Sequence, residues 1–272
     1  RSFLSRMITR LESEQSVKEY LDIMDHRKTE QLIDTLDKVE QNRKECYIRE
    51  FSIEHFHDSK VFETLIPKIC KIFREENEEL TGFENEEILA EYQIYKTPGY
   101  VYMKGNVQIY SAGKQAADIS AFPEGIAVAV GSEEDVPDIC PDQTIDKVFT
   151  IENLTSFYRF KQEHSLVIYL GGYHNRSRRN MLMQIYQKLP DAQYYHFGDL
   201  DAGGFYILEH LKRKTGIPFQ MFQMDIETLK KYEDYAKPLT ENDKKRLMQL
   251  EKMELPDEER KLITYMLQKG IK

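Results

Sequence analysis

The chain has 272 residues, of which 40 % are apolar and 31 % are charged, a composition typical of a globular protein. Its 38 Lys and Arg residues stand against 47 Asp and Glu residues, so the formal net charge of −9 argues against a nonspecific nucleic-acid coat. Apolar runs such as residues 165–172 are far shorter than the ~20 residues of a membrane helix, so no membrane span is expected. No signal peptide is expected either, and three widely spaced cysteines indicate a reducing, cytoplasmic compartment.

The charge is unevenly distributed along the chain. Residues 74–91 contain eight Glu and one Arg, which indicates a solvated face or, alternatively, a docking surface for a protein partner. Residues 147–190 contain seven Lys or Arg and two Glu, a local charge of +5. The acidic total is therefore compatible with a basic surface that faces DNA.

The first half of the chain predicts helices followed by strands. Residues 1–45 have apolar side chains at helical spacing and lack Gly and Pro, which predicts a helical arm. Residues 59–80 predict a second helix. From residue 88 to residue 118, aromatic and branched side chains alternate with polar ones around Pro98-Gly99 and Gly105-Asn106, which indicates a β-hairpin region. A helix followed by a β-hairpin suits a winged-helix module.

The second half predicts a different architecture, after a domain boundary expected in the polar segment 131–144. Predicted strands alternate with helices there. The order is strand 147–151, strand 166–170, helix 178–189, strand 194–198, helix 203–214 and strand 219–224. This alternation predicts an α/β unit with a mainly parallel sheet, whose functional residues lie at the carboxyl ends of its strands. Two or three helices are expected in the tail, one of them starting at a capping box of Thr240 and Asp243.

Three carboxylates follow two of these strands. Glu152 comes directly after the strand 147–151, and Asp199 and Asp201 come after the strand 194–198. Carboxylates that meet at one sheet edge repel each other, and a divalent cation removes this conflict. Mg²⁺, with Mn²⁺ as an alternative, suits such oxygen ligands. A turn with a helix cap is the simpler interpretation of the Asp-x-Asp pair.

The glycines that follow the second aspartate fit a phosphate-binding role. Gly203 and Gly204 stand at the predicted start of a helix, where the absence of side chains lets a phosphate come close to the backbone.

Basic residues follow the Gly171-Gly172 turn and are candidate phosphate contacts. They are Arg176, Arg178 and Arg179, and the alternative is a solvated first turn of a helix. His174 is a weaker candidate acid or phosphate donor, with a surface histidine as the alternative.

Three further residues have two interpretations each. Asp225 is either a helix N-cap or a support for a metal ligand. Lys60 is a candidate DNA contact on the winged-helix face. Lys104 either reaches a phosphate or protects the end of the hairpin from edge-to-edge pairing.

Longer motifs carry a resemblance to a known family. Glu after a first strand and Asp-x-Asp after a later one resemble the Toprim domain of topoisomerases and primases. Five stretches resemble the JetD family, the Toprim subunit of Wadjet plasmid-defence systems, over about residues 50 to 250. They are residues 53–60 (IEHFHDSK), 96–105 (KTPGYVYMKG), 119–127 (ISAFPEGIA), 151–157 (IENLTSF) and 196–204 (HFGDLDAGG).

This resemblance implies a two-domain α+β fold similar to the A subunit of topoisomerase VI. A helical arm (1–50) would precede a winged-helix, CAP-like domain (51–144) and a Toprim α/β domain with C-terminal helices (145–272). The resemblance implies that the chain is the nuclease of a complex that also contains an SMC-type ATPase, a kleisin and a further winged-helix subunit. This complex would cleave closed circular plasmid DNA. By the same resemblance, Glu152, Asp199 and Asp201 match the metal-binding carboxylates.

One motif departs from the topoisomerase VI relatives, which carry a catalytic Tyr in a motif like Arg-Glu-Ile-Tyr-Tyr. The nearest counterparts, Arg49-Glu50-Phe51 and residues 53–56, lack this Tyr. Hydrolysis by a metal-activated water is therefore expected, rather than a covalent tyrosyl intermediate. Because a symmetric double-strand cut needs two active sites, a homodimer is expected.

Three alternative functions stay open from the sequence. They are a strand-passing enzyme like topoisomerase VI, a DNA-binding adaptor with an inert Toprim fold, and a stand-alone RNA-processing nuclease.

Overall fold

The computed structural model describes residues 2–77, 80, 83–96, 99–130, 137–171 and 176–272. It is an α+β structure with two compact units, Arg1–Thr97 and Pro98–Lys272. Within these described ranges, none of the helices combines the length and the apolar character that crossing a membrane requires.

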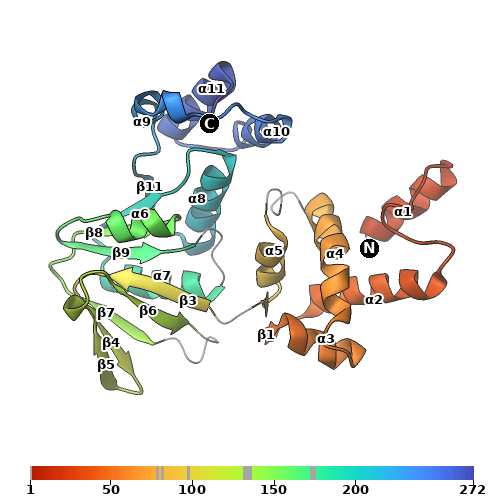
Figure 1. The fold of residues 1–272 in the computed structure, drawn as a ribbon, viewed down its shortest axis with the longest axis horizontal. Helices are drawn as coiled ribbons and strands as arrows, with labels where there is room; N and C mark the ends of the chain where they lie inside the picture. The colour runs from red at the N-terminus through yellow and green to blue at the C-terminus, as the bar shows by residue number, and fades with distance from the viewer. Residues whose placement is uncertain (1, 78–79, 81–82, 97–98, 131–136, 172–175) are drawn as a thin grey trace. The chain divides into compact units, whose positions relative to one another are not determined.

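The first unit is mainly helical. Its elements are α1 (Ser2–Glu12), α2 (His26–Gln41), β1 (Cys46–Tyr47), α3 (Ile48–Phe56), α4 (Val61–Glu76), α5 (Asn85–Glu91) and β2 (Ile94–Tyr95) (Figure 1). Strands β1 and β2 form a short parallel pair. The helix predicted over residues 59–80 is confirmed as α4, which buries Ile69, Ile72 and Phe73 along one face.

Residues 1–45, predicted as a helical arm, form the two helices α1 and α2, because residues 13–25 interrupt the helix. Asp25 starts α2 by accepting a hydrogen bond from the Lys28 amide at 3.1 Å. In the interruption, Tyr20 is buried and its hydroxyl donates to Glu75 on α4 at 2.7 Å. A side-chain cap and a tertiary contact therefore bend the chain at a place without Gly or Pro, where periodicity gave no signal.

The second unit contains two sheets. Its elements are β3 (Gly99–Lys104), β4 (Val107–Ser111), β5 (Lys114–Asp118), the 3₁₀-helix η2 (Ile119–Ala121), β6 (Ile126–Val130), β7 (Asp138–Pro141), β8 (Lys147–Ile151), α6 (Leu154–Arg159), β9 (Ser165–Tyr169), α7 (Arg176–Lys188), β10 (Gln193–Phe197), α8 (Ala202–Thr215), β11 (Gln220–Met221), α9 (Ile226–Lys231), η3 (Glu233–Tyr235), α10 (Glu241–Leu250) and α11 (Asp257–Lys269). The larger sheet has the order β11-β10-β8-β9-β3-β6, and the smaller one has the order β5-β4-β7. In the larger sheet, β8 to β11 are parallel as predicted, and β3 and β6 extend it as antiparallel strands.

A glycine corner directs the chain from the larger sheet to the smaller one. Gly105 has a φ of +137°, and a Cβ there would lie 2.6 Å from the carbonyl oxygen of Ser165, so only glycine fits. The Gly105-Asn106 pair therefore connects two sheets instead of closing a hairpin. The hairpin of this region is β4–β5, which turns at Ala112-Gly113, both with positive φ.

The division into units differs from the predicted boundary at residues 131–144, of which 131–136 lie outside the described residues. Strands β3 and β6 pair with each other and, through β9, with the larger sheet, so residues 99–130 belong to the second unit. Pairing between segments so distant in the chain leaves no trace in local composition. Because the strands expected to form the wing lie in the second unit, the winged-helix domain stays a prediction.

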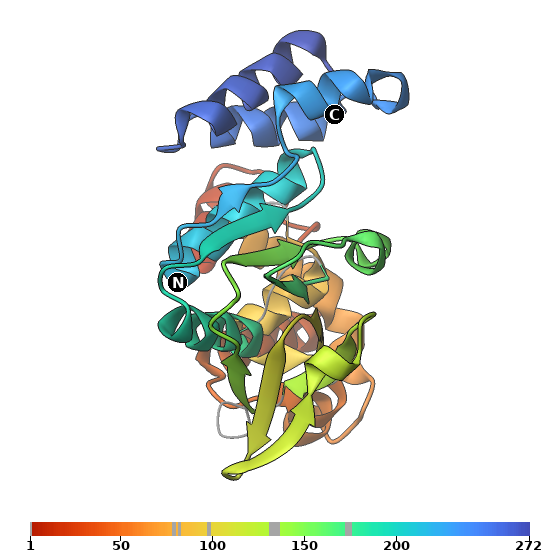
Figure 2. The same ribbon diagram turned by 90° about the vertical axis from the view of Figure 1, so that its left-hand side faces the viewer.

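Helices cover both faces of the larger sheet. Val148, Leu166 and Ile168 share one cluster with side chains of α7 and α8, and Phe149 and Val167 share another with Phe157 of α6. Burial on both faces explains why β8 and β9 are nearly continuous apolar runs. A third cluster joins α8 to α9, α10 and α11, and Figures 1 and 2 show these C-terminal helices grouped beyond α8.

Candidate functional site

Glu152 and Asp199 lie at the carboxyl ends of two neighbouring parallel strands. The register of β8 and β10 ends with Ile151 opposite Phe197, and the Glu152 amide donates to Phe197 O at 3.0 Å. The Glu152 carboxylate turns toward the end of β10, where its Oε2 accepts a hydrogen bond from Asp199 N at 3.2 Å. The Glu152 side chain at the end of β8 therefore stabilises the backbone at the end of β10 through this hydrogen bond.

Asp201 serves as the N-cap of α8. Its backbone is extended, with φ −144° and ψ 176°, and its Oδ1 accepts a hydrogen bond from Gly204 N at 3.0 Å. Partial desolvation and then the negative charge of Asp201 raise the pKa of Asp199, and Lys237 opposes this rise. The helix-cap interpretation of the Asp-x-Asp pair is therefore confirmed for Asp201, and the charge conflict expected of a carboxylate cluster is also present.

Glycine is required at two positions of this turn because other atoms occupy the space of a side chain. A Cβ at Gly204 would lie 2.2 Å from the backbone oxygen of Asp199. A Cβ at Gly198 would lie 2.8 Å from His196 Nε2 and 2.9 Å from Glu152 Oε2. Position 204 therefore requires glycine because the backbone of Asp199 lies so close to it, whereas the sequence suggested the approach of a phosphate.

Two basic residues that the sequence did not single out border this edge. Arg246 of α10 places its Nη2 3.9 Å from the position of a Cβ on Gly203, and its guanidinium lies over Tyr206 of α8, 5.3 Å from the ring centroid. Its Nε is buried without a hydrogen-bond partner among the described residues. Lys237 is close enough to lower the pKa of Asp199. Because the C-terminal helices fold back onto α8, no local pattern could reveal either residue.

The donor set fits a divalent cation in chemical type. Hard carboxylate oxygens suit Mg²⁺ or Mn²⁺, and a cation would offset the desolvation and the repulsion by Asp201 that raise the pKa of Asp199. In the part of the chain that the structure describes, no three His, Cys, Asp or Glu side chains converge as a ready ligand set. Glu152 and Asp201 instead each accept a hydrogen bond from a backbone amide through one carboxylate oxygen.

The predicted phosphate-binding arginines differ in their surroundings. The Arg178 guanidinium donates to the carbonyl oxygens of Leu170, through Nη1, and of Tyr100, through Nη2 at 3.3 Å. It therefore ties the end of β9 to β3. Arg179 is half-buried and its charge acts on His210 of α8.

Two of the predicted phosphate contacts, Arg176 and His174, lie in part or in whole outside the described residues. Arg176 starts α7, but its side chain is outside the described part of the structure, as is the whole of His174.

Other candidates have local structural roles. Asp225 is the N-cap of α9, accepting from Thr228 N at 2.6 Å, which confirms the capping interpretation. The predicted capping box of Thr240 and Asp243 starts α10 and is confirmed. Lys60 is exposed at the start of α4 in the first unit, and its role as a DNA contact stays a prediction.

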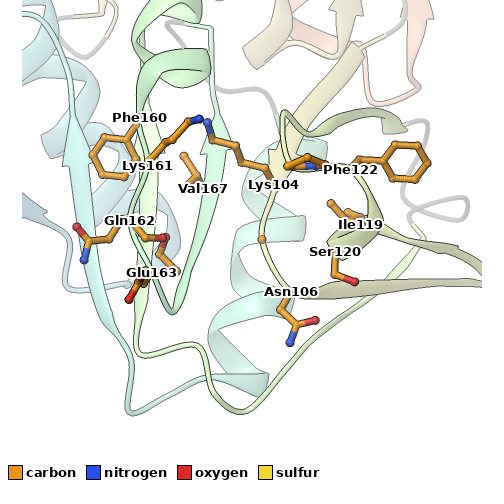
Figure 3. Close-up of a pocket in the computed structure, with 13 residues that line it drawn as sticks. Lys104, Asn106, Ile119, Ser120, Phe122, Phe160, Lys161, Gln162, Glu163 and Val167 are labelled. Carbon is orange, nitrogen blue, oxygen red and sulfur yellow. The ribbon is translucent and has the colours of Figure 1, made fainter.

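Lys104 lies far from this edge, beside a cavity of about 630 Å³ at the amino-terminal end of β9. Figure 3 shows Lys104 and Lys161 extending toward each other at one side of this cavity. Lys104 is 7 % exposed, and its Nζ donates to the carbonyl oxygens of Phe157, at 2.6 Å, and Tyr158, at 3.3 Å. Burial lowers the pKa of this ammonium. Lys104 therefore holds the last turn of α6, a role that neither of its predicted interpretations included.

Comparisons with known proteins show which family this chain resembles. The family model described as "Wadjet protein JetD, C-terminal" matches residues 134–272, just over half of the chain, including all three carboxylates. The chain is also similar to the Wadjet protein JetD of Bacillus cereus strain Q1, with 28 % identity over 235 residues. This match covers 85 % of the chain and 56 % of the relative, so the chain spans about half the length of that protein.

Proposed function

The chain belongs to the JetD family of Wadjet proteins, and from that premise we propose that it is the DNA-cleaving subunit of a Wadjet-type plasmid-defence complex. Its substrate would be closed circular double-stranded DNA, and its reaction the metal-dependent hydrolysis of phosphodiester bonds at a Toprim-type site. The second unit would correspond to the Toprim domain, with the winged-helix domain before it.

One observation carries the proposal of catalysis. Glu152 and Asp199 meet at the carboxyl ends of the adjacent parallel strands β8 and β10, and Asp201 is close enough to raise the pKa of Asp199. Functional residues of such sheets gather at this edge. A purely structural edge has no need for the Asp201 charge beside a partly desolvated Asp199, whereas a divalent cation would turn this repulsion into attraction.

Each residue of the edge would have a defined part in the reaction. Glu152, Asp199 and Asp201 would hold Mg²⁺ or Mn²⁺, which when bound lowers the pKa of an attacking water and offsets charge on the leaving oxygen. Arg246 and Lys237 would contribute positive charge to orient a backbone phosphate. Since no tyrosine stands in Arg49-Glu50-Phe51 or residues 53–56, direct hydrolysis is proposed rather than a covalent protein–DNA intermediate.

The proposed partners follow from the family rather than from the chain's geometry. They are an SMC-type ATPase, a kleisin and a further winged-helix subunit. A second copy of this chain is proposed because a cut through both strands needs two active sites.

Cleavage of supercoiled circular DNA tests the proposal. The wild-type chain and Glu152→Gln would be incubated with Mg²⁺ or Mn²⁺, alone and with the SMC-type ATPase, kleisin and winged-helix subunits. We expect the substitution to slow cleavage by roughly 100-fold, because several kcal/mol of transition-state stabilisation depend on the metal. Glu227→Gln, at an exposed position of α9, removes the same charge away from the edge and should cleave like wild type.

The possible outcomes separate the alternatives. A requirement for the partner subunits supports a Wadjet role over a free nuclease. Covalent protein–DNA adducts would favour an enzyme like topoisomerase VI, and cleavage of structured RNA without partners would favour an RNA-processing nuclease. If the wild-type chain binds no divalent cation and never cuts, even in the complete complex, the catalytic proposal fails and a DNA-binding adaptor takes its place.

A further inference from the structure

Two glutamates and one lysine meet between α8 and α11, with little access to solvent. Glu209 and Lys212 belong to the second half of α8, and Glu259 belongs to the first turn of α11. Glu259 is 3 % exposed, and the side chains of Glu209 and Lys212 are 14 % and 20 % exposed. Two carboxyl groups and one ammonium therefore share a poorly hydrated space between the two helices.

The single ammonium bonds both carboxyl groups and leaves one oxygen unsatisfied. Lys212 Nζ donates to Glu209 Oε1 at 2.7 Å and also to Glu259 Oε1. The second oxygen of Glu259, Oε2, is buried and has no hydrogen-bond partner among the described residues. With both carboxyl groups ionised, this cluster would carry a net charge of 2 − 1 = 1 negative unit out of water, which is unfavourable.

One proton removes this imbalance. Burial, followed by the charge of Glu209 and a hydrogen bond with its carboxyl group, raises the pKa of Glu259 to about 7, although Lys212 acts in the opposite direction. A hydrogen bond between two carboxyl groups requires a proton on one of them, because ionised carboxylates only accept. With that proton, the two carboxyl groups and the ammonium are neutral in total.

The surrounding groups do not supply a second positive charge. Asp257, Glu258 and Arg260, which neighbour Glu259 on α11, are exposed. Burial lowers the pKa of His196 in β10 and of His210 in α8, so both imidazoles are neutral. Within the described part of the chain, the charge of the cluster therefore depends on the proton.

The end of α11 fixes a segment that borders the carboxylate edge. Lys237 and Lys272 exchange two backbone hydrogen bonds of 2.8 Å, and Leu239 N donates to Gly270 O at 2.8 Å. The charge of Lys237 in turn lowers the pKa of Asp199. The packing of α11 on α8 therefore bears on the position of a lysine at this edge.

We propose that Glu209 and Glu259 share one proton and form a pH-sensitive contact that holds α11 on α8. Loss of the proton leaves an uncompensated buried charge and weakens this contact, and with it the anchoring of Lys237. The folded chain keeps a proton that the unfolded chain releases near pH 4.5, the ordinary value for Glu259. The stabilisation is thus complete below this pH, and it is lost as the pH rises through 7. The inference involves neither a metal nor DNA, so its outcome does not depend on the proposed function.

A carboxyl titration of the full chain detects the proton directly. In protein labelled with ¹³C at the glutamate side-chain carboxyl, we expect one signal to titrate near pH 7. This signal should be absent from Glu259→Gln, and its midpoint should fall in Glu209→Gln, which removes the second carboxylate. Glu258→Gln, at an exposed position of the same helical turn, is the matched control and should keep the signal. The inference is overturned when no glutamate of the wild-type chain titrates above pH 6, or when the signal persists in Glu259→Gln.

Amide hydrogen exchange measures the effect on α11. After correction for the intrinsic exchange rate, the opening equilibrium of the α11 amides should rise about tenfold between pH 6 and pH 8, as one proton linked to a pKa of about 7 requires. The rise should stay below about twofold in Glu259→Gln and should match wild type in Glu258→Gln. An equal rise in wild type and in folded Glu259→Gln would show that other groups cause the pH dependence and would overturn the inference.

Discussion

Replacing Gly204 with alanine tests how the turn between β10 and α8 is packed. A Cβ at this position would lie 2.2 Å from Asp199 O and 3.0 Å from Asp199 N. Both are backbone atoms, which cannot rotate aside, so Asp199 and its strand end must shift. Forced overpacking costs about 1–3 kcal/mol or more, while replacing glycine inside a helix returns up to about 1 kcal/mol. We expect a net loss of about 2 kcal/mol, which lowers the melting temperature by about 4–8 °C for a unit of this size.

The neighbouring glycine is a matched control. At Gly203, in the same first turn of α8, the nearest atom to a Cβ is Asp201 Oδ1 at 3.0 Å, and Arg246 Nη2 follows at 3.9 Å. Both belong to side chains that can move, so Gly203→Ala should not lower the free energy of unfolding by more than about 0.5 kcal/mol. Urea denaturation of the full chain, followed by far-UV circular dichroism, compares the two variants. Equal stability of the two would refute the close approach of Gly204 to Asp199 and the reason given for this glycine.

Three further outcomes follow from particular contacts. Burial opposes the effect, but hydrogen bonds from Lys272 and from Thr240 in the capping box lower the pKa of Asp243 to about 2. The contribution of the Asp243 carboxylate to the free energy of unfolding is therefore present above pH 4 and is lost as the pH falls toward 2. Urea denaturation across this range should show a loss of at most about 2 kcal/mol, and Asp243→Asn should abolish this pH dependence. Lys104→Met should cost about 1–3 kcal/mol in thermal unfolding because it leaves two carbonyl oxygens without their donor, whereas an equal loss in exposed Lys161→Met would contradict this. In a fluorescence titration, Arg246→Ala should weaken DNA binding and reduce the salt dependence of the binding constant by about one counterion. Lys245→Ala, on the exposed face of the same helix, should retain more affinity for DNA. Equal effects of the two substitutions would exclude a specific phosphate contact for Arg246.

Local patterns predicted the parallel core of the second unit well. Lys147–Ile151 coincides with β8, and the capping box of Thr240 and Asp243 starts α10 as expected. These features depend on neighbours in the chain. The strand follows from its continuous apolar run, and the capping box joins two residues that are three positions apart. The positions of Glu152 and Asp199 at strand ends followed from the same local information and from the general geometry of parallel sheets.

Most of the predictions that needed correction involved distant partners. The helix predicted over residues 1–45 is interrupted where Asp25 caps α2 and Tyr20 contacts Glu75. Strands β3 and β6 join the larger sheet because β3 pairs with β6 and β9. Lys104 serves α6 rather than a hairpin edge, since its ammonium reaches carbonyl oxygens more than fifty positions along the chain. Neither composition nor periodicity contains information about such pairings.

The sequence by itself therefore determined the alternating strands and helices, the carboxylates at strand ends and the motifs shared with the JetD family. Only the tertiary structure decided that Asp201 caps α8 while its charge acts on Asp199, that Arg246 and Lys237 border the same edge, and that His196 lies buried below it. The physical reason is that hydrogen bonding, desolvation and charge act over a few ångströms of space. Residues that are far apart in the chain acquire these interactions only when the sheet and the C-terminal helices have packed together.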